Sequence, residues 1–331
     1  MKRTPTKLAL IIFLILTIRL SAQEQKFYTF PEFEFQNGKI AKEIKIGFRE
    51  FGTINSDSSN IIIVLSWFGG TSSHLTLLLG NDRVIDTVNY YVICFDAFGN
   101  GVSSSPDNYT ISELPEFTIS DMVKAQYKYL NEVRGFNSIF AAVGGSMGGM
   151  QVFDWVVSYP DFLKKAVSYV STPRTSNYSK MIFNFVMDAI SYYEESKISE
   201  QEATRIIDKV FQLLATGKPV INSKDEQFFL KFDGNSYKSF PLINRKSQTL
   251  AMISHDVIKN RSYEELKEII KTKLLIMVSD NDDLVTNEEA INFGNSLGFE
   301  TIIISNNGGH YAPGMELQKT GETVRRFLKE D

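Results

Sequence analysis

The sequence is poor in cysteine, since Cys94 is the only one among 331 residues. A chain with one cysteine forms no internal disulfide, which excludes the class of small exported domains that disulfides hold together. It also excludes a lipoprotein anchored through an N-terminal cysteine, because Cys94 lies far inside the chain within an apolar stretch. We expect Cys94 to be a small buried core residue.

An excess of positive charge is also lacking. The 35 Lys and Arg residues against 39 Asp and Glu residues give a formal net charge of −4. The sequence contains no run of Lys and Arg, which argues against nucleic acid as the main partner. Hydrophobic residues make up 43% of the chain. A chain of this length and composition has enough apolar side chains for one large domain with a buried core, with room for an inserted subdomain.

One long and mostly apolar run stands out, at residues 8–18 near the N-terminus. Cationic residues precede it, and the small-residue segment Leu20-Ser21-Ala22 follows it. This pattern predicts a secretory signal peptide over residues 1–22, and the run is short for a membrane span, which takes about 20 residues. The alternative is an uncleaved anchor. We therefore expect the protein to be exported, either periplasmic or secreted.

Segments with strand character alternate with helical segments over most of the chain. The pair Asn37-Gly38 between alternating apolar residues predicts an N-terminal β-hairpin. Strands that alternate with helices predict an α/β fold, with a mostly parallel twisted sheet and helices on both faces. Further strands are expected at 60–65, 90–95, 140–143, 165–170, 273–278 and 301–304, and helices at 119–133, 147–158, 287–297 and 316–328.

The alternation breaks between residues 175 and 269. Helical periodicity at 181–193 and 198–214 continues there without a clear strand. We interpret this stretch as a helical lid inserted between two strands of the sheet, the alternative being a packed subdomain that lines no pocket. The predicted organisation is a signal peptide at 1–22, a core formed by 23–174 and 270–331, and a lid at 175–269.

The strongest chemical signal is the segment Gly144-Gly145-Ser146-Met147-Gly148-Gly149. It lies between a predicted strand and a predicted helix, which is the context of a G-x-S-x-G turn that lifts a nucleophilic serine above a sheet. Glycines flank Ser146 because larger side chains would collide in so sharp a turn. We therefore predict that Ser146 is a nucleophile that carries an acyl group.

A serine hydroxyl needs an adjacent base, and the sequence offers three histidines. His310 follows the last predicted strand in a glycine-rich loop, whereas His74 follows an early strand and His255 lies in the lid. In folds with this serine turn, the catalytic residues run in the order Ser, acid, His. We therefore predict His310 as the base, with His74 and His255 as weaker candidates.

The acid that orients the base should follow the strand at 273–278. Three carboxylates compete in the segment after this strand, namely Asp280, Asp282 and Asp283. Asp282 is placed best, because it stands three residues before Val285, which closes the turn. Asp280 is the alternative, and Asp283 is a candidate cap for the helix that follows.

Acyl transfer also needs hydrogen-bond donors for the oxyanion that forms on the carbonyl oxygen. One donor should be the backbone N–H of Met147, directly after the nucleophile. The other should come from Trp67-Phe68-Gly69-Gly70, the loop after the first core strand. We choose the backbone N–H of Phe68. The alternative is that the aromatic pair in this loop is a hydrophobic plug.

These residues resemble the homoserine O-acetyltransferase family of α/β-hydrolases. The similarity covers about residue 51 to the C-terminus and includes Gly144 to Gln151. It also includes the segments at 117–123 with Gln126, 232–237, 282–285 and 309–310. The resemblance implies an α/β-hydrolase fold and a ping-pong reaction. Ser146 would take an acyl group from a thioester such as acetyl-CoA and pass it to a hydroxyl.

The resemblance also implies the substrate-binding residues. Arg205 matches a lid arginine that grips the carboxylate of an amino acid, while a second family arginine is replaced by Met187. Tyr311 occupies the position after the base, where the family usually has an acidic residue that holds the amino group. These departures favour an acceptor other than homoserine.

Two other functions remain open from the sequence. One is a secreted serine esterase or thioesterase that uses water as the acceptor, and the other is a binding protein without catalysis. The intact Ser146, Asp282 and His310 argue against the second. We predict no metal and no cofactor. The expected partners are a small-molecule acyl donor and hydroxyl acceptor, or an ester, with a homodimer as a further option.

Overall fold

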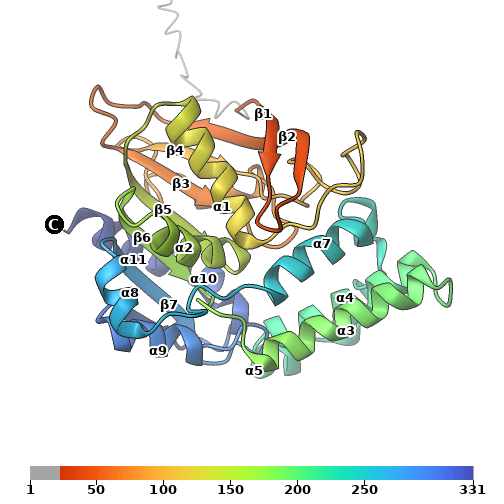
Figure 1. Ribbon diagram of the computed structural model, residues 1–331. Helices are drawn as coiled ribbons and strands as arrows, with labels where there is room; N and C mark the ends of the chain where they lie inside the picture. The colour runs from red at the N-terminus through yellow and green to blue at the C-terminus, as the bar shows by residue number, and fades with distance from the viewer. Residues whose placement is uncertain (1–22, 331) are drawn as a thin grey trace, which may run out of the picture.

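The computed structural model describes residues 23–330, so the predicted signal peptide at 1–22 lies outside the described residues. One eight-stranded sheet in the order β1-β2-β4-β3-β5-β6-β7-β8 forms the centre of the fold (Figure 1). Strand β2 is antiparallel to β1 and to β4, and the other neighbours pair in parallel. The strands are β1 (Lys26–Glu34), β2 (Ile40–Phe51), β3 (Ile61–Leu65), β4 (Tyr91–Phe95), β5 (Ile139–Gly145), β6 (Leu163–Tyr169), β7 (Lys273–Ser279) and β8 (Glu300–Ile304).

The predicted N-terminal hairpin is present as β1 and β2. Its turn uses Gly38 with a φ of 79°, a conformation that glycine adopts without steric cost. Phe33 and Phe35 are buried and contact the ring of Phe98. The hairpin is therefore fixed to the sheet by its inward aromatic side chains.

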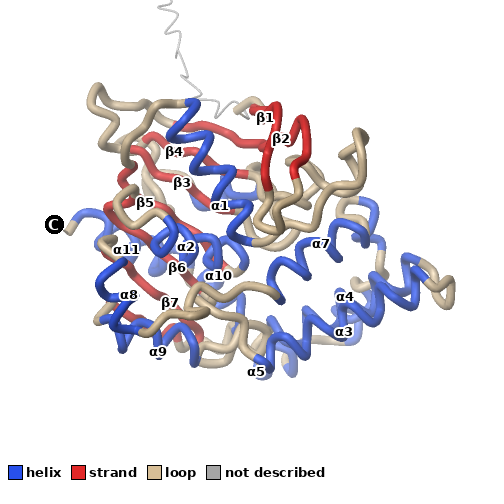
Figure 2. The backbone as a smooth tube through the Cα atoms, viewed as in Figure 1, coloured by secondary structure: helices blue, strands red, loops and turns tan. Residues whose placement is uncertain are grey.

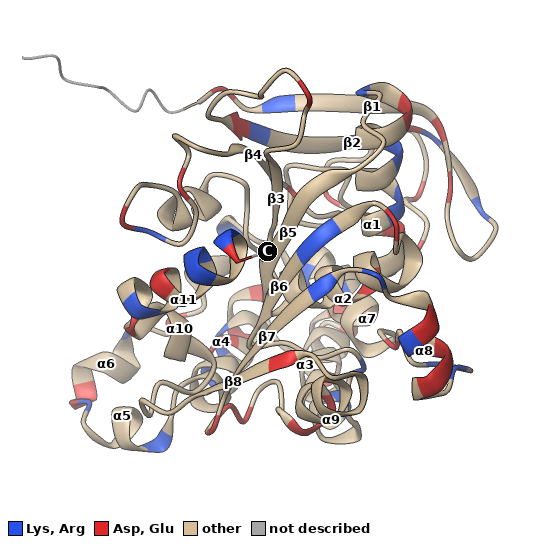
Figure 3. Cartoon of the chain, turned by 90° about the vertical axis from the view of Figure 1, so that its left-hand side faces the viewer, with Lys and Arg blue, Asp and Glu red and all other residues tan. Residues whose placement is uncertain are grey.

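Helices cover both faces of the sheet, which confirms the predicted α/β fold. Alternate residues of β3 belong to two different cores, Ile61 and Ile63 to one and Ile62 and Val64 to the other, because successive strand residues point to opposite faces. Figure 3 shows α11 and α10 on one side of the sheet and α1, α2, α8 and α9 on the other. Their bounds are α1 (Ile119–Lys128), α2 (Met147–Ser158), α8 (Tyr263–Ile269), α9 (Glu288–Leu297), α10 (Ala312–Met315) and α11 (Leu317–Lys329).

The helix predicted at 119–133 differs from the observed element in one respect. The α-helix ends at Lys128, and a π-helical turn over Tyr129–Val133 continues it. Thr118 and Asp121 form a reciprocal capping box at its start, which satisfies two backbone N–H groups that a helix end leaves free.

A helical insertion, defined as residues 170–272 between β6 and β7, lies beside the sheet except for α8, which covers one face of it (Figure 2). Ser176 caps α3, and Ser199 caps α4 through a capping box with Glu202. The insertion contains α3 (Asn177–Glu194), α4 (Glu200–Ala215), α5 (Lys218–Asn222), α6 (Glu226–Leu230), α7 (Leu242–Ile253) and α8. Within residues 23–330, no helix combines the length and apolar character that a membrane crossing requires.

Candidate active site

Ser146 occupies a strained turn between β5 and α2. Its backbone angles are φ 54° and ψ −127°, a region that non-glycine residues adopt only when the surrounding structure enforces it. The turn places Ser146 at the carboxyl end of a central parallel strand and at the N-terminus of α2. The helix end contributes free N–H groups and the positive end of its dipole beside the serine.

Neighbouring atoms leave no room for a side chain at the glycines around Ser146. A Cβ atom on Gly144 would lie 2.3 Å from the carbonyl oxygen of Gly148, and one on Gly148 would lie 2.3 Å from that of Leu65. A Cβ atom on Gly145 would lie 2.1 Å from the ring of Tyr169. Backbone cannot move aside as a flexible side chain can, so the turn holds its shape only with glycine at positions 144 and 148, and a side chain at 145 would have to displace the ring of Tyr169.

The structure brings Asp282 and His310 into direct contact. Nδ1 of His310 lies 2.6 Å from Oδ2 of Asp282. Because an ionised carboxylate only accepts hydrogen bonds, Nδ1 is the donor in this contact, and in a neutral imidazole the lone pair is then on Nε2. Oδ1 of Asp282 accepts the backbone N–H groups of Leu284 and Val285, each at 3.0 Å. The carboxylate is therefore held from both sides, and it orients the imidazole.

The two competing carboxylates lie elsewhere in the same loop. Asp280 is exposed, and the side chain of Asp283 is 43% exposed with Lys218 at 3.7 Å. The side chain of Asp282 is 1% exposed. Burial and the contact with His310 thus separate Asp282 from its neighbours.

Ser146 and His310 line the same cavity, which has a volume of about 570 Å³. Tyr311 also lines it and is half exposed, so an uncharged phenol stands directly after the histidine. Of the described residues that line this cavity, none is Asp, Glu, Lys or Arg. The cavity is therefore an apolar space with a serine hydroxyl and an imidazole in its wall.

The predicted oxyanion donors lie next to this cavity. Met147 is the first residue of α2, a position whose N–H has no partner within the helix. Phe68 lines the cavity within a turn that the N–H of Gly70 closes on the carbonyl of Trp67 at 2.8 Å. The ring of Phe68 packs edge-on against Phe211. Phe68 thus has a backbone amide beside the cavity of Ser146 and an aromatic ring that packs against the insertion.

A buried glutamine from the insertion holds the turn that contains Phe68. Oε1 of Gln248 on α7 accepts the N–H of Gly69 at 2.8 Å, and its Nε2 donates to the carbonyl of Phe98 at 2.8 Å. Gln248 is fully buried. No local pattern in the sequence predicts this role for Gln248, because its partners lie about 150 and 180 positions away.

A second buried network fixes the same turn from the core side. Nε2 of Gln151 donates to the carbonyl of Ser66 at 3.1 Å, and its Oε1 accepts from Gln126 at 2.7 Å. The indole N–H of Trp155 donates to Oε1 of Gln126 at 2.9 Å. The helix after the nucleophile and the strand before the candidate oxyanion turn are thereby joined.

Arg205 is not brought to the cavity. It is exposed on α4 and absent from the residues that line the cavity. The buried face of α4 carries Ala203 and Ile207, so the helical repeat turns Arg205 away from it. The buried guanidinium of the insertion belongs to Arg245, which lies 3.0 Å from Asp208.

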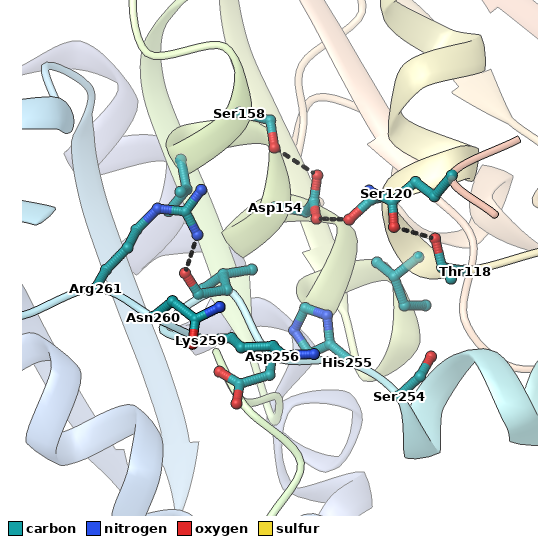
Figure 4. Close-up of a pocket in the computed structure, with 14 residues that line it drawn as sticks. Thr118, Ser120, Asp154, Ser158, Ser254, His255, Asp256, Lys259, Asn260 and Arg261 are labelled. Atoms are coloured by element: carbon teal, nitrogen blue, oxygen red, sulfur yellow. Dashed lines mark hydrogen bonds between the residues drawn. The ribbon is translucent and has the colours of Figure 1, made fainter. Parts of the chain in front are cut away.

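The two other histidines lie away from Ser146. His74 is exposed at the start of a short 3₁₀ helix (His74–Leu78). His255 lines a second cavity of about 480 Å³, which shares no lining residue with the first (Figure 4). There Nε2 of His255 donates to the carbonyl of Thr172 at 3.1 Å, and burial lowers the pKa of the imidazole to about 4. His255 is therefore a neutral, structurally bonded histidine.

The same polar cavity contains a buried carboxylate. Asp154 on α2 accepts hydrogen bonds from the hydroxyls of Ser120 and Ser158, the second at 3.0 Å. Burial raises the pKa of Asp154 to about 6. Among residues 23–330, no three His, Cys, Asp or Glu side chains gather in a way that would hold a metal ion.

Comparison with known proteins agrees with this fold. Residues 78–313 match the family model described as alpha/beta hydrolase fold. A homoserine O-acetyltransferase of Methanococcus vannielii is 30% identical to this chain, over 81% of the chain and 64% of the relative. An ethyl acetate hydrolase of Pseudomonas veronii is 36% identical over 47% of the chain and 46% of the relative. The resemblance predicted from the motifs is confirmed, and the chain spans less than two thirds of the length of these relatives.

The fold itself is matched over nearly the whole chain. An acetylester hydrolase from Corynebacterium glutamicum superimposes with a TM-score of 0.84, covering 93% of this chain and 96% of that protein at 19% sequence identity. At this level of identity the likeness concerns the fold alone.

Proposed function

The chain belongs to the alpha/beta hydrolase fold family, and from this premise we propose that it is an enzyme that carries an acyl group on Ser146. The observation that supports the proposal is the Asp282–His310 contact of 2.6 Å in the wall of the cavity that Ser146 also lines. A histidine whose Nδ1 is held by a buried carboxylate presents Nε2 as a base for a serine hydroxyl.

In the first half of the reaction, Nε2 of His310 takes the hydroxyl proton of Ser146 while Oγ bonds to the carbonyl carbon of the substrate. The electron pair of the carbonyl moves to its oxygen, which the N–H groups of Met147 and Phe68 stabilise. The bond to the leaving group then breaks, and the leaving oxygen or sulfur receives the proton from Nε2. The acyl group remains on Ser146.

We propose water as the acceptor in the second half of the reaction, which makes the protein a serine esterase. A hydroxyl acceptor with a carboxylate would need a cationic partner, and none of the described residues that line the cavity is charged. Arg205, the predicted carboxylate grip, is exposed on α4. Similarity to an ethyl acetate hydrolase is consistent with this acceptor.

Transfer to a hydroxyl acceptor is the second candidate. It is favoured by the similarity to a homoserine O-acetyltransferase over 81% of the chain. In that case the donor is a thioester such as acetyl-CoA, and the acceptor competes with water for the same acyl-enzyme.

The test uses p-nitrophenyl acetate and mass spectrometry after brief mixing. The protein should gain one acetyl group on Ser146, and Ser146→Ala should gain none while keeping its far-ultraviolet circular dichroism. An unchanged adduct on the variant contradicts the proposal. Adding homoserine then separates the two acceptors, since O-acetylhomoserine forms under transfer and acetate alone forms under hydrolysis.

A further inference from the structure

The cavity at Ser146 extends over both faces of the sheet. Ser146 stands at the carboxyl end of β5, with strands on either side. The lining residues Leu78, Val84 and Leu317 pack with the core on the α11 side, whereas Phe183 and Met252 pack with the core on the opposite side. The lining of the cavity therefore comes from both faces of the sheet, and Ser146 stands at the end of a strand between these faces.

We name the halves by what lines them. The α11 arm is lined by Leu77, Leu78, Val84, Pro313, Met315, Leu317 and Thr320. The insertion arm is lined by Phe183, Phe211, Ala215, Met252, Leu284 and Val285. Apart from Thr320, whose hydroxyl donates to the carbonyl of Pro313 at 2.9 Å, every side chain in these two sets is apolar.

An ester has two parts, the acyl chain and the alcohol group, which extend from the carbonyl carbon in different directions. When Oγ of Ser146 attacks the carbonyl carbon, the acyl chain and the alcohol group diverge from the reacting centre. A cavity with a single apolar arm would accommodate one of them and leave the other in water. Two apolar arms on either side of Ser146 provide a place for each.

We infer that the substrate is an uncharged ester with apolar groups on both sides of its carbonyl, one in each arm. This inference rests on the proposed acyl-enzyme at Ser146 and specifies its substrate class. A buried carboxylate or ammonium would lose its hydration without gaining a partner, because the described lining contains no charged residue. Apolar groups gain from the same surroundings by leaving water.

Two ester series measure the two arms separately. p-Nitrophenyl esters from acetate to octanoate vary the acyl side, and butyrate esters from ethyl to hexyl vary the alcohol side. We expect kcat/KM to rise about fourfold for each added methylene until an arm is full, which corresponds to ~0.8 kcal/mol per buried CH₂. Monoethyl glutarate should be cleaved ~100-fold or more slowly than ethyl hexanoate, because its carboxylate has no partner in the cavity.

Variants with a larger side chain in one arm show whether that arm binds the acyl part or the alcohol part of the ester. Leu317→Trp narrows the α11 arm and Met252→Trp narrows the insertion arm, and each residue lies outside the catalytic groups. Each variant should shorten the chain length accepted in one series and leave the other series unchanged. Far-ultraviolet circular dichroism and the melting temperature of each variant serve as the folding control.

The outcomes separate this inference from the proposed function. If Ser146 is acetylated but kcat/KM falls steadily from the shortest ester in both series, the two-arm assignment is overturned while the acyl-enzyme stands. The same holds if both variants shorten the same series or if neither shortens any. If no ester acylates Ser146, the proposed function itself fails.

Discussion

Among single residues, Asp282 shows how position rather than acidity singles out one candidate catalytic group. Three carboxylates stand within four positions after β7, and all three have the same intrinsic chemistry. The turn after β7 folds the N–H groups of Leu284 and Val285 onto Oδ1 of Asp282 and leaves Oδ2 for His310. The backbone N–H groups of residues next to Asp282 in the sequence thus hold its carboxylate in place.

Replacing Asp282 should cost far more activity than replacing its neighbours. Asp282→Asn removes the charge and allows the imidazole to adopt the wrong tautomer, so kcat should fall by about 10⁴, the loss known for this change in the trypsin-type triad. Asp280→Asn and Asp283→Asn serve as matched controls and should stay within about threefold of the wild type, as expected for exposed positions. Cleavage of a p-nitrophenyl ester measures all three, and an equal loss for Asp280→Asn would contradict the assignment.

The sequence was informative about residues whose role follows from their immediate neighbours. Ser146 is marked by flanking glycines, and Asp282 and His310 by the ends of predicted strands. Arg205 was proposed from a motif, but the side on which a helical residue lies depends on the whole helix, whose inward face is set by Ala203 and Ile207. Gln248 carries no local signal, because its function arises from partners in distant loops.

At the scale of secondary-structure elements, the turn Trp67–Gly70 is held by two helices that approach from different directions. On one side α2 fixes Ser66 through Gln151, and on the other α7 fixes Gly69 through Gln248. An oxyanion donor acts only when it is already aimed at the developing charge. The two contacts hold the residues on either side of Phe68, the proposed oxyanion donor, in place.

Gln248 should act as a positioning residue for this turn. Gln248→Leu keeps the approximate volume but leaves the N–H of Gly69 and the carbonyl of Phe98 without partners. We expect kcat to fall about tenfold with little change in KM, since removal of an oxyanion donor itself costs about 10²–10³. Stability should fall by about 1–3 kcal/mol.

Gln248→Glu distinguishes positioning from a purely structural role, because it retains an acceptor for Gly69. It should restore most of kcat, even if its melting temperature stays low. If kcat per folded molecule is unchanged in Gln248→Leu, the contact has no part in catalysis.

The contact between Ser120 of α1 and Asp154 of α2 involves a buried carboxyl group, and we expect its ionisation to make the stability of the protein depend on pH. Burial raises the pKa of Asp154 from 3.8 to about 6 in the folded protein, so folding favours the protonated form. Ionised Asp154 therefore lowers stability above pH 6, and this cost disappears as the pH falls through 6 towards 4. Asp154→Asn should be more stable than the wild type by up to about 3 kcal/mol at pH 8.

Urea unfolding at pH 8 and pH 4.5 measures this effect. The advantage of Asp154→Asn should shrink strongly at the lower pH, and Ser158→Ala should show no such pH-dependent gain. A variant that is less stable than the wild type at pH 8 would mean that the hydroxyls of Ser120 and Ser158 stabilise the carboxylate more than burial disfavours it.

The elements themselves were predictable where local signals are strong. The helix at 147–158 was predicted with its observed bounds, because a glycine turn precedes it and a proline follows soon after it. The short helices α5 and α6 were not predicted, since five residues give too little periodicity to recognise. The helix α7 was also missed, because its mixed polar and apolar buried face, which includes Gln248 and Arg245, hides the pattern.

On the scale of the whole molecule, the helical insertion and the core meet at His310, the proposed base. The end of α4 passes so close to the loop before His310 that a Cβ atom on Gly217 would lie 1.9 Å from the carbonyl oxygen of Asn307. A Cβ atom on Gly309 would lie 2.6 Å from the carbonyl oxygen of Ala215. The insertion therefore contributes cavity walls and also supports the loop that carries the base.

Gly217→Ala should consequently impair catalysis from a position outside the catalytic groups. The added methyl group must push the backbone at Asn307 aside, which shifts His310 relative to Ser146, and misplacement by about 1 Å can cost about 100-fold in rate. Gly314→Ala is the matched control, because Gly314 lines the same cavity but has nothing within 4 Å of its would-be Cβ atom. We expect kcat for p-nitrophenyl butyrate to fall strongly in the first variant and to change little in the second, with melting temperatures recorded for both. Equal rates in the two variants would show that the loop absorbs the methyl group without moving His310, and that the insertion shapes the cavity without setting the position of the base.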